Sequence, residues 1–334
     1  MAPLSRIAIV ILNWNGQALL ERYLPSVMQF SQEAQVMVID NASTDNSVSF
    51  LQNSYPQIQI IQNPKNLGFA GGYNLGLKTI EAEYLVLLNS DVEVTENWLQ
   101  PIISLLDNEP RIAAVQPKIL DARKKNHFEY AGACGGFLDR YAYPYCRGRI
   151  FETLEEDTSQ YNEAIEVHWA SGACFFIRKK VFDELKGLDE DLFAHMEEID
   201  LCWRARGKGY LIYCEPASTV YHQGGATLSG HSPFKSYLNF RNNLIMLLKN
   251  DRSGHTFILL YVRLLLDGLS VVRFIFQGRL DHAWAVFKAH LHFYRGIGKT
   301  LKKRRELGGN SSARSPFSIV YRYFAQGRTT FDSL

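Results

Sequence analysis

Polar and glycine-rich loops follow four short apolar segments within the first 95 residues. These loops are residues 13–15, 40–45, 65–74 and 89–93. In an open sheet of parallel strands, the loops at the carboxyl ends of the strands bind the ligand, so these side chains should meet at one edge. Carboxylate and amide oxygens bind hard metal ions and hydrogen-bond to nucleotides and sugars. We therefore expect one shared binding site at that edge.

The first 115 residues alternate between apolar, β-rich runs and amphipathic segments, which is typical of a parallel sheet with crossover helices. The predicted strands are residues 6–12, 35–40, 58–62, 84–88 and 113–116. The predicted helices are residues 17–30, 44–54, 69–80 and 96–106. The fold class is therefore α/β, with the four polar and glycine-rich loops at the ends of its strands.

Beyond residue 115 the predicted order of elements becomes mixed. Residues 121–160 are polar and rich in aromatic side chains, and we expect long loops and hairpins there. Residues 164–169 and 173–178 are expected to form a pair of strands joined by Ser171-Gly172. The remaining predicted elements are a helix at residues 197–208 and two short strands at residues 211–214 and 219–221.

Five short motifs occur in order along the first 225 residues. They are Ile39-Asp40-Asn41-Ala42-Ser43-Thr44-Asp45, Asn66-x-Gly68-Phe69-Ala70-Gly71-Gly72-x-Asn74, Asn89-x-Asp91, Glu197-Glu198-x-Asp200-Leu201-Cys202-x-Arg204 and His222-x-Gly224-Gly225. In this order they resemble the inverting family 2 glycosyltransferases of the GT-A fold, especially rhamnosyltransferase-like members of bacterial surface-polysaccharide pathways. The resemblance implies a mostly parallel central sheet with flanking helices in residues 1–232, followed by a helical region in residues 233–334.

The resemblance also implies a reaction and a donor site. A sugar would pass from dTDP-rhamnose or a UDP-sugar to a hydroxyl of a saccharide or lipid-linked acceptor. The implied donor-binding residues are Asn13, Asn15, Asp40, Asn66, Gly68, Gly72, Asn74, Asn89 and Asp91. The glycine-rich segment is neither a Walker loop nor a G-x-G-x-x-G motif, but its backbone can approach a phosphate or sugar closely at a helix N-terminus. Gly71 and Gly72 could instead serve only helix packing.

Asp40 ends a buried strand, where an unpaired carboxylate is costly, so it needs a hydrogen-bonding partner. By resemblance it binds the base or ribose of the donor, with Asn13 and Asn15 in the same pocket. The alternative is that Asp40 and Asp45 only cap the helix that follows.

Asn89-x-Asp91 takes the place of the D-x-D metal motif of the resembling family, with Asn in place of the first acid. Mg²⁺ or Mn²⁺ would take oxygen ligands from Asp91, while the diphosphate supplies others. The resemblance implies His222 as a second protein ligand from a distant part of the chain. Glu93 either assists this site or faces solvent.

Glu197, Glu198 and Asp200 cluster at the start of a predicted helix. Acids favour a helix N-terminus in any protein, and Asp200 can pair with Arg204 one turn on. An inverting transferase also needs a carboxylate to deprotonate the acceptor, and clustered acids raise one another's pKa. The resemblance implies Glu198 as this base, with Glu197 and Asp200 as alternatives. Trp169 either lies against an acceptor sugar or belongs to the core.

The net charge of +2 hides an asymmetry: residues 233–334 hold 17 Lys and Arg against 5 Asp and Glu, and the rest of the chain is acidic. Within residues 261–279 the polar positions fall on one helical stripe: Arg263, Asp267, Ser270, Arg273 and Gln277. Such a helix should bury most of its circumference. Basic and aromatic neighbours favour a membrane surface, and the alternative is a cap on the catalytic domain or on a second subunit. No motif of a nucleic-acid-binding fold accompanies these charges.

Five isolated cysteines and the lack of a signal or spanning segment predict a reduced, cytoplasmic protein attached peripherally to the inner face of the cell membrane. Two rival functions remain. A sugar nucleotidyltransferase would need a basic, glycine-rich loop after the first strand, and residues 13–16 lack one. A non-catalytic, membrane-associated subunit would not need Glu198.

Overall fold

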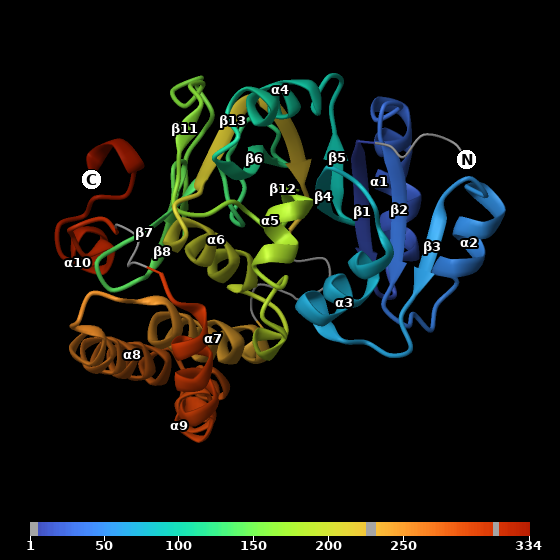
Figure 1. The fold of residues 1–334 in the computed structure, drawn as a ribbon. Helices are drawn as coiled ribbons and strands as arrows, with labels where there is room; N and C mark the ends of the chain where they lie inside the picture. Colours follow the sequence, from blue (N-terminus) through green and yellow to red (C-terminus); the bar gives the residue numbers. More distant parts are fainter. Residues whose placement is uncertain (1–5, 225–231, 310–313) are drawn as a thin grey trace.

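The computed structural model describes residues 6–224, 232–309 and 314–334, and Gly225 of the fifth motif lies outside them. The strands of its larger sheet are β1 (Ile7–Asn13), β2 (Gln35–Asp40), β3 (Gln59–Gln62), β4 (Tyr84–Asn89), β5 (Val92–Val94), β6 (Ile112–Asp121), β11 (Ile165–Glu166), β12 (Cys174–Arg178) and β13 (Leu211–His222). Their order is β11-β13-β6-β12-β4-β1-β2-β3, and β5 pairs with β13 (Figure 1).

Helices cover both faces of this sheet. They are α1 (Gln17–Phe30), α2 (Ser47–Ser54), α3 (Gly68–Gly76), α4 (Gln100–Asn108), α5 (Lys179–Glu184) and α6 (Glu197–Gly207). Because successive side chains of a strand point to opposite faces, Ile9 lies in a core with α1, α2 and α4, whereas Val10 lies in a core with α3 and α6.

Parallel pairing brings the carboxyl ends of three strands together. β1 runs parallel to β2 and β4, so that Asn13 lies opposite Asp40 and Leu12 opposite Asn89. β12 runs antiparallel between β4 and β6, so its first residue, Cys174, lies at the same edge. The predicted α/β fold is therefore present, and the ligand-binding loops share one edge.

The predicted pairing of residues 164–169 with residues 173–178 is wrong. β11 pairs with β13, whereas both sides of β12 are occupied by β4 and β6. No edge of β12 is left for the earlier segment, and the backbone N–H of Val167 donates to Ile212 O instead.

Two further boundaries differ from the prediction. α2 begins at Ser47 rather than at residue 44, because the Asp45 carboxylate accepts the backbone N–H groups of Ser47 and Gln17. The two short strands predicted near residue 215 form one strand, β13, whose register shifts between Glu215 and Thr219. The predicted hairpins of residues 121–160 form a small antiparallel sheet of β7 (Gly136–Leu138), β8 (Pro144–Cys146), β9 (Arg149–Ile150) and β10 (Thr153–Leu154).

The C-terminal region is helical: α7 (Pro233–Asn250), α8 (Thr256–Phe276), α9 (Leu280–Leu307) and α10 (Ile319–Phe324). In Figure 1, α7, α8 and α9 lie together below α6, and α10 lies beside β7 and β8. The expectation that α8 buries most of its circumference is wrong, because only Thr256, Leu260, Arg263 and Asp267 are buried and many of its apolar side chains are exposed. Within the described residues, no helix is both long enough and apolar enough to cross a bilayer.

Candidate active site

The ends of β1 and β2 are joined by buried polar side chains. Asn13 Nδ2 donates to Asp40 Oδ1 and to Ser43 Oγ, both at 3.1 Å. Asp40 Oδ2 accepts the backbone N–H of Ser43 at 3.0 Å, so Asp40 organises its own loop and does not cap α2. Asn15 Oδ1 accepts the backbone N–H of Thr44 at 2.7 Å. These contacts hold Asn13, Asn15 and Asp40 in one pocket wall.

The loop before α3 packs closely against its neighbours. Asn66 Oδ1 accepts both the Asn41 amide and the backbone N–H of Gly68. Gly68 has φ of +71°, and a Cβ there would lie 2.5 Å from the ring of Phe193. A Cβ at Gly72 would lie 2.9 Å from Leu12, next to the end of β1. Glycine at both positions therefore lets the loop approach the end of the sheet.

Asn74 lies further along α3 and does not face this pocket wall. Its side chain donates to Leu188 O at 2.8 Å and accepts the backbone N–H of Leu188 at 2.9 Å. This two-way hydrogen bond fastens α3 to the loop that leads into α6. The geometry thus gives Asn74 a positioning role relative to the predicted donor site.

Asp91 and His222 meet although 131 residues separate them in the chain. The strand pairing explains this, since Val92 of β5 lies opposite His222 of β13. His222 Nε2 lies 3.1 Å from Asp91 Oδ1, and its Nδ1 lies 3.2 Å from Glu129 Oε2. Burial alone would lower the pKa of His222, but Glu129 and Asp91 raise it to about 10. Burial alone would raise the pKa of Asp91, but His222 holds it below its usual value.

This pair fits the chemistry of a divalent metal site. Asp91 and His222 are both buried and offer one carboxylate and one imidazole, and Asn89 ends the strand just before Asp91. His222 would have to release its proton when a metal ion binds, because only the neutral ring is a ligand. Metal-binding histidines generally direct their second ring nitrogen to a carboxylate, as His222 does to Glu129. Among the described residues no group of three or more His, Cys, Asp or Glu side chains is arranged to hold a metal, so further ligands would come from the donor or from water.

Glu129 was missed in the sequence analysis. It belongs to the segment predicted as loops, and no spacing links it to His222. The one local signal is Gly224 in the fifth motif, which has φ of +60° and whose added Cβ would lie 2.6 Å from Glu129 Oε1. This glycine is required because the Glu129 carboxylate occupies the space of a side chain.

Glu197 and Glu198 begin α6, and within residues 6–224, 232–309 and 314–334 neither forms an ion pair with a cationic side chain. Oε2 of each has no hydrogen-bond partner among the described residues. Burial raises the pKa of Glu198 to about 7. Burial, together with the neighbouring Glu198, raises the pKa of Glu197 well above its usual value. The raised pKa favours the neutral form of Glu197, whereas Glu198 can accept or release a proton near neutral pH.

Glu198 lies at the same edge of the sheet as Asp91. A Cβ added at Gly172 would lie 3.8 Å from Glu198 Cδ and 3.5 Å from Phe69 at the start of α3. The next residue, Ala173, accepts the backbone N–H of Asn89 through its carbonyl oxygen at 3.0 Å. One short segment therefore connects the candidate base, the glycine-rich loop and the Asn89-x-Asp91 motif.

Asp200 has different surroundings. It is fully buried, and Arg204 Nε, Lys249 Nζ and Asn250 Nδ2 contact its carboxylate at 2.8, 2.7 and 2.7 Å. Both carboxylate oxygens are thus engaged by groups of α6 and α7. This arrangement fastens two helices together and leaves no free oxygen for a substrate.

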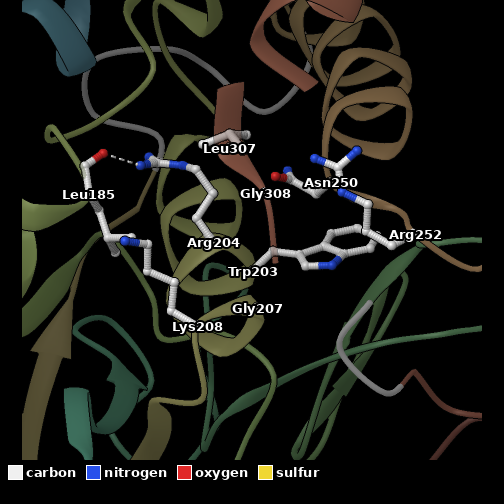
Figure 2. Close-up of a pocket in the computed structure, with 9 residues that line it drawn as sticks. All are labelled: Leu185, Trp203, Arg204, Gly207, Lys208, Asn250, Arg252, Leu307 and Gly308. Atoms are coloured by element: carbon white, nitrogen blue, oxygen red, sulfur yellow. Dashed lines mark hydrogen bonds between the residues drawn. The ribbon is translucent and has the colours of Figure 1, made fainter. Parts of the chain in front are cut away.

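Arg204 extends this structural network. Figure 2 shows its guanidinium group directed to the backbone carbonyl of Leu185, at 2.6 Å, beside Trp203 and Asn250. The pocket among these side chains has a volume of about 20 Å³. That is room for about one water molecule, so the pocket is too small for a nucleotide sugar.

Trp169 belongs to the core, one of its two predicted roles. Its ring is 3% exposed and its Nε1 donates to Phe137 O at 3.0 Å. Glu93 faces the surface, where it pairs with Lys125 at 2.6 Å.

Comparison with known families covers the donor side of this site. The model of the family described as "Glycosyl transferase family 2" matches residues 8–186. The chain belongs to glycosyl transferase family 2. The match runs from β1 to α5 and includes the donor-side loops and Asn89-x-Asp91, but it ends before Glu198 and His222. It establishes a glycosyltransferase, so the nucleotidyltransferase and the non-catalytic subunit are no longer needed as alternatives.

Two relatives and one structure carry the likeness further along the chain. The "Low-salt glycan biosynthesis hexosyltransferase Agl10" of Haloferax volcanii is 24% identical over 86% of this chain and 90% of its own length. The "N-acetylglucosaminyl-diphospho-decaprenol L-rhamnosyltransferase" of Mycobacterium tuberculosis is 25% identical over 74% and 85%. The mannosyltransferase PcManGT of Pyrobaculum calidifontis, solved with GDP-Man and Mn²⁺, superposes with a TM-score of 0.54 at 14% identity, over 92% of this chain and 86% of its own. The GT-A fold and the rhamnosyltransferase-like resemblance are thereby confirmed.

Proposed function

We propose that this glycosyltransferase moves a sugar, with inversion, from dTDP-rhamnose or a UDP-sugar to a hydroxyl of a saccharide or lipid-linked acceptor in cell-surface polysaccharide biosynthesis. The observation that supports the proposal is that the Asp91–His222 pair and Glu198, whose Oε2 has no partner among the described residues, lie at the same edge of the sheet. The name of the mycobacterial relative, which describes rhamnose transfer to a lipid-linked sugar, supports the choice of donor and acceptor.

The donor lies along the carboxyl ends of the strands. Asn13, Asn15 and Asp40 bind the base and ribose, and the backbone from Asn66 to Gly72 approaches the diphosphate and sugar. Asn89 and Asp91 lie beside the diphosphate. This order follows from the sheet, in which β2, β1 and β4 are neighbours.

Asp91 and His222 would hold Mg²⁺ or Mn²⁺, which supplies positive charge to the departing diphosphate. Glu129 fixes the ring of His222 with Nε2 toward Asp91. Because such outer carboxylates commonly contribute 10- to 100-fold to metal affinity, Glu129→Gln should weaken Mn²⁺ binding by roughly that factor. Calorimetric titration with MnCl₂ measures this without any substrate turnover.

Glu198 acts as the general base. Its carboxylate removes the proton of the acceptor hydroxyl, and the acceptor oxygen attacks the anomeric carbon from the face opposite the diphosphate. The bond between the anomeric carbon and the diphosphate oxygen breaks, and the nucleoside diphosphate leaves. Glu198 can then release the proton to water, since its pKa of about 7 is close to the working pH.

The protein is proposed to work in the cytoplasm, attached peripherally to the inner face of the cell membrane through residues 233–334. The net charge of +12 in that region favours an anionic surface. A lipid-linked acceptor would be reached there without leaving the membrane.

The test is a panel of nucleotide sugars with purified protein and MgCl₂ or MnCl₂, read by thermal shift and by release of the nucleoside diphosphate. Asp91→Ala should lower the metal-dependent rate by about 100-fold or more, because a bound metal ion lowers the activation free energy by several kcal/mol. Glu93→Ala, a nearby acid in a surface pair, is the matched control and should behave as wild type. If no donor binds, or if Asp91→Ala matches the control, the proposed mechanism is wrong.

A further inference from the structure

α8 is oriented with its polar side chains inward. Arg263 is 2% exposed, its guanidinium carbon lies 3.5 Å from the centre of the Tyr143 ring, and Nη1 donates to Tyr141 O. Asp267 is fully buried and pairs with His290 of α9 at 3.0 Å. These polar contacts, together with Leu260 in the core, dock one side of the helix, and the apolar residues of the opposite side point away from the protein.

The outward face of α8 is a continuous apolar stripe. Its members recur every three or four residues, as one face of a helix requires, and are between 47% and 88% exposed: Phe257, Tyr261, Leu265, Leu269, Val272 and Phe276. A second stripe with the same spacing follows on α9: Leu280, Trp284, Phe287, Leu291 and Tyr294. We call these eleven side chains the apolar face.

A face of this size is unusual for a chain surrounded by water. The largest apolar patch of a typical monomer measures about 300–600 Å². At 150–250 Å² for each large side chain, the exposed fractions of the apolar face correspond to an area on the order of 1,000 Å². Exposure of this apolar area to water is unfavourable, so a partner that covers it gains affinity.

The charges around the apolar face indicate which partner covers it. Residues 256–307 carry six exposed Lys or Arg side chains and two exposed Asp or Glu. A groove of about 770 Å³ runs along the flank of α8 at Val262 and Leu266, and Arg140, Arg322 and Arg328 line it as well. An apolar helix face that contains Trp and Tyr and is bordered by basic side chains matches the boundary between the acyl chains and anionic headgroups of a bilayer.

The apolar face also lies near the candidate active site. α9 packs on α7, where the Tyr237 hydroxyl bonds to His292 at 2.6 Å. The first turn of α7 reaches the site, since Phe234 contacts Phe193 and Lys235 lies 5.7 Å from the ring of Tyr130. Figure 1 shows these helices at the same end of the molecule as the start of α3. Helix α7 would thus lie between the surface formed by α8 and α9 and the candidate active site.

We propose that the apolar face lies within the interfacial layer of a bilayer that contains anionic phospholipid, with the arginine-lined groove against the headgroups. The proposal rests on the proposed function in one respect, since a lipid-linked acceptor explains why the site is held at this surface. It names the surface of the protein that makes contact: α8 and the first four turns of α9 lie in the membrane plane, apolar side down.

Vesicle binding by the full chain tests the proposal. Wild-type protein should co-sediment with vesicles of phosphatidylcholine and phosphatidylglycerol, and less with phosphatidylcholine alone or at high salt. Leu265→Glu with Leu269→Glu should reduce the vesicle affinity at least tenfold at unchanged melting temperature, because both side chains are already exposed. Gln52→Glu with Asn53→Glu adds the same charge on exposed positions of α2 and should bind as wild type.

Hydrogen exchange of wild-type protein provides a second measurement that needs no variant. Vesicles should protect α8 and the first half of α9, whereas the sheet should be unaffected. Failure of the wild type to bind either vesicle, or loss of binding in both double variants, would overturn the proposal. So would a dimer that Leu265→Glu with Leu269→Glu dissociates, because a second copy would then cover the apolar face. Donor-induced thermal shifts are measured separately and test the transferase mechanism whatever the vesicles show.

Discussion

Glu198 and Asp200 are two residues apart on α6, yet their surroundings are opposite. Asp200 is held by Arg204, Lys249 and Asn250, whereas Glu198 has no cation beside it and leaves Oε2 without a partner among the described residues. A buried carboxylate that is fully paired contributes to a unique structure. A buried carboxylate without a cation keeps a raised pKa, which is the property of a base.

The same contrast extends to the loop before α6. Burial alone would raise the pKa of Asp189, but Lys249 and Lys303 hold it well below the usual value. Burial raises the pKa of Glu198, and no cation in the described part of the chain opposes this rise. Lysines of α7 and α9 thus pair with Asp189 and Asp200. None of the cations in the described residues is paired with Glu198.

The largest expected effect is the loss of the base. Glu198→Gln should reduce kcat by 10²- to 10⁴-fold, the usual contribution of general-base catalysis, because the amide cannot accept the proton. Its melting temperature should not fall. Steady-state kinetics with a turned-over donor and thermal unfolding measure both quantities. A variant with near wild-type kcat would assign the base elsewhere.

Asp200→Asn should produce the opposite result. Asp200→Asn leaves Arg204 without its counter-charge and Lys249 with Asp189 alone, and loss of one partner of a buried ion pair typically costs about 3–5 kcal/mol. Urea unfolding should show this loss, while the protein that remains folded keeps its kcat. If stability is unchanged and kcat collapses, Asp200 is the catalytic acid of the cluster and the comparison is reversed.

The pH dependence should follow Glu198. Its raised pKa means that it is protonated at low pH, so kcat/KM should rise about tenfold for each pH unit below 7 and level off above it. The folded state binds this proton more tightly than the unfolded state, so its stabilising effect should be full below about pH 4.5 and lost as the pH rises through 7. A profile that is flat from pH 5.5 to 8 would exclude Glu198.

The smallest effect is expected at Glu197. Burial and the neighbouring Glu198 raise the pKa of this side chain well above its usual value, which favours its neutral form. Glu197→Gln has almost the same shape, so kcat should change by less than about threefold, within the error of context-dependent effects. It is the matched control for Glu198→Gln, and a large loss there would mean that the two acids act together.

Much of the donor side could be predicted from the sequence. The alternation of apolar runs and helical segments located β1 to β4, and parallel pairing then required Asn13, Asp40 and Asn89 to share an edge. The positions of these strands follow from local sequence patterns. The shared edge follows from the rule that neighbouring parallel strands end on the same side of a sheet. The pairing of β12 could not be predicted, because it depends on which strand edges are free after the rest of the sheet has formed.

The surroundings of the acids could not be predicted either. Lys249 reaches Asp200 from a helix 49 residues further along, and Glu129 reaches His222 from a loop 93 residues earlier. The stripe on α8 was recognised, but an amphipathic pattern does not say which of its two faces meets the protein. Arg263 and Asp267 found partners in Tyr143 and His290, and those contacts determined the direction.

The antiparallel pairing of β5 with β13 brings Asp91 and His222 together, so the proposed metal site depends on the register of these two strands. Side chains alternate along a strand, so a slip of one residue would turn His222 to the other face of the sheet, away from Asp91. A donor that needs both residues would then select only molecules whose long last strand is in register. Donor binding thus serves as a check on correct folding, and saturating donor should stabilise β5 and β13 against local opening.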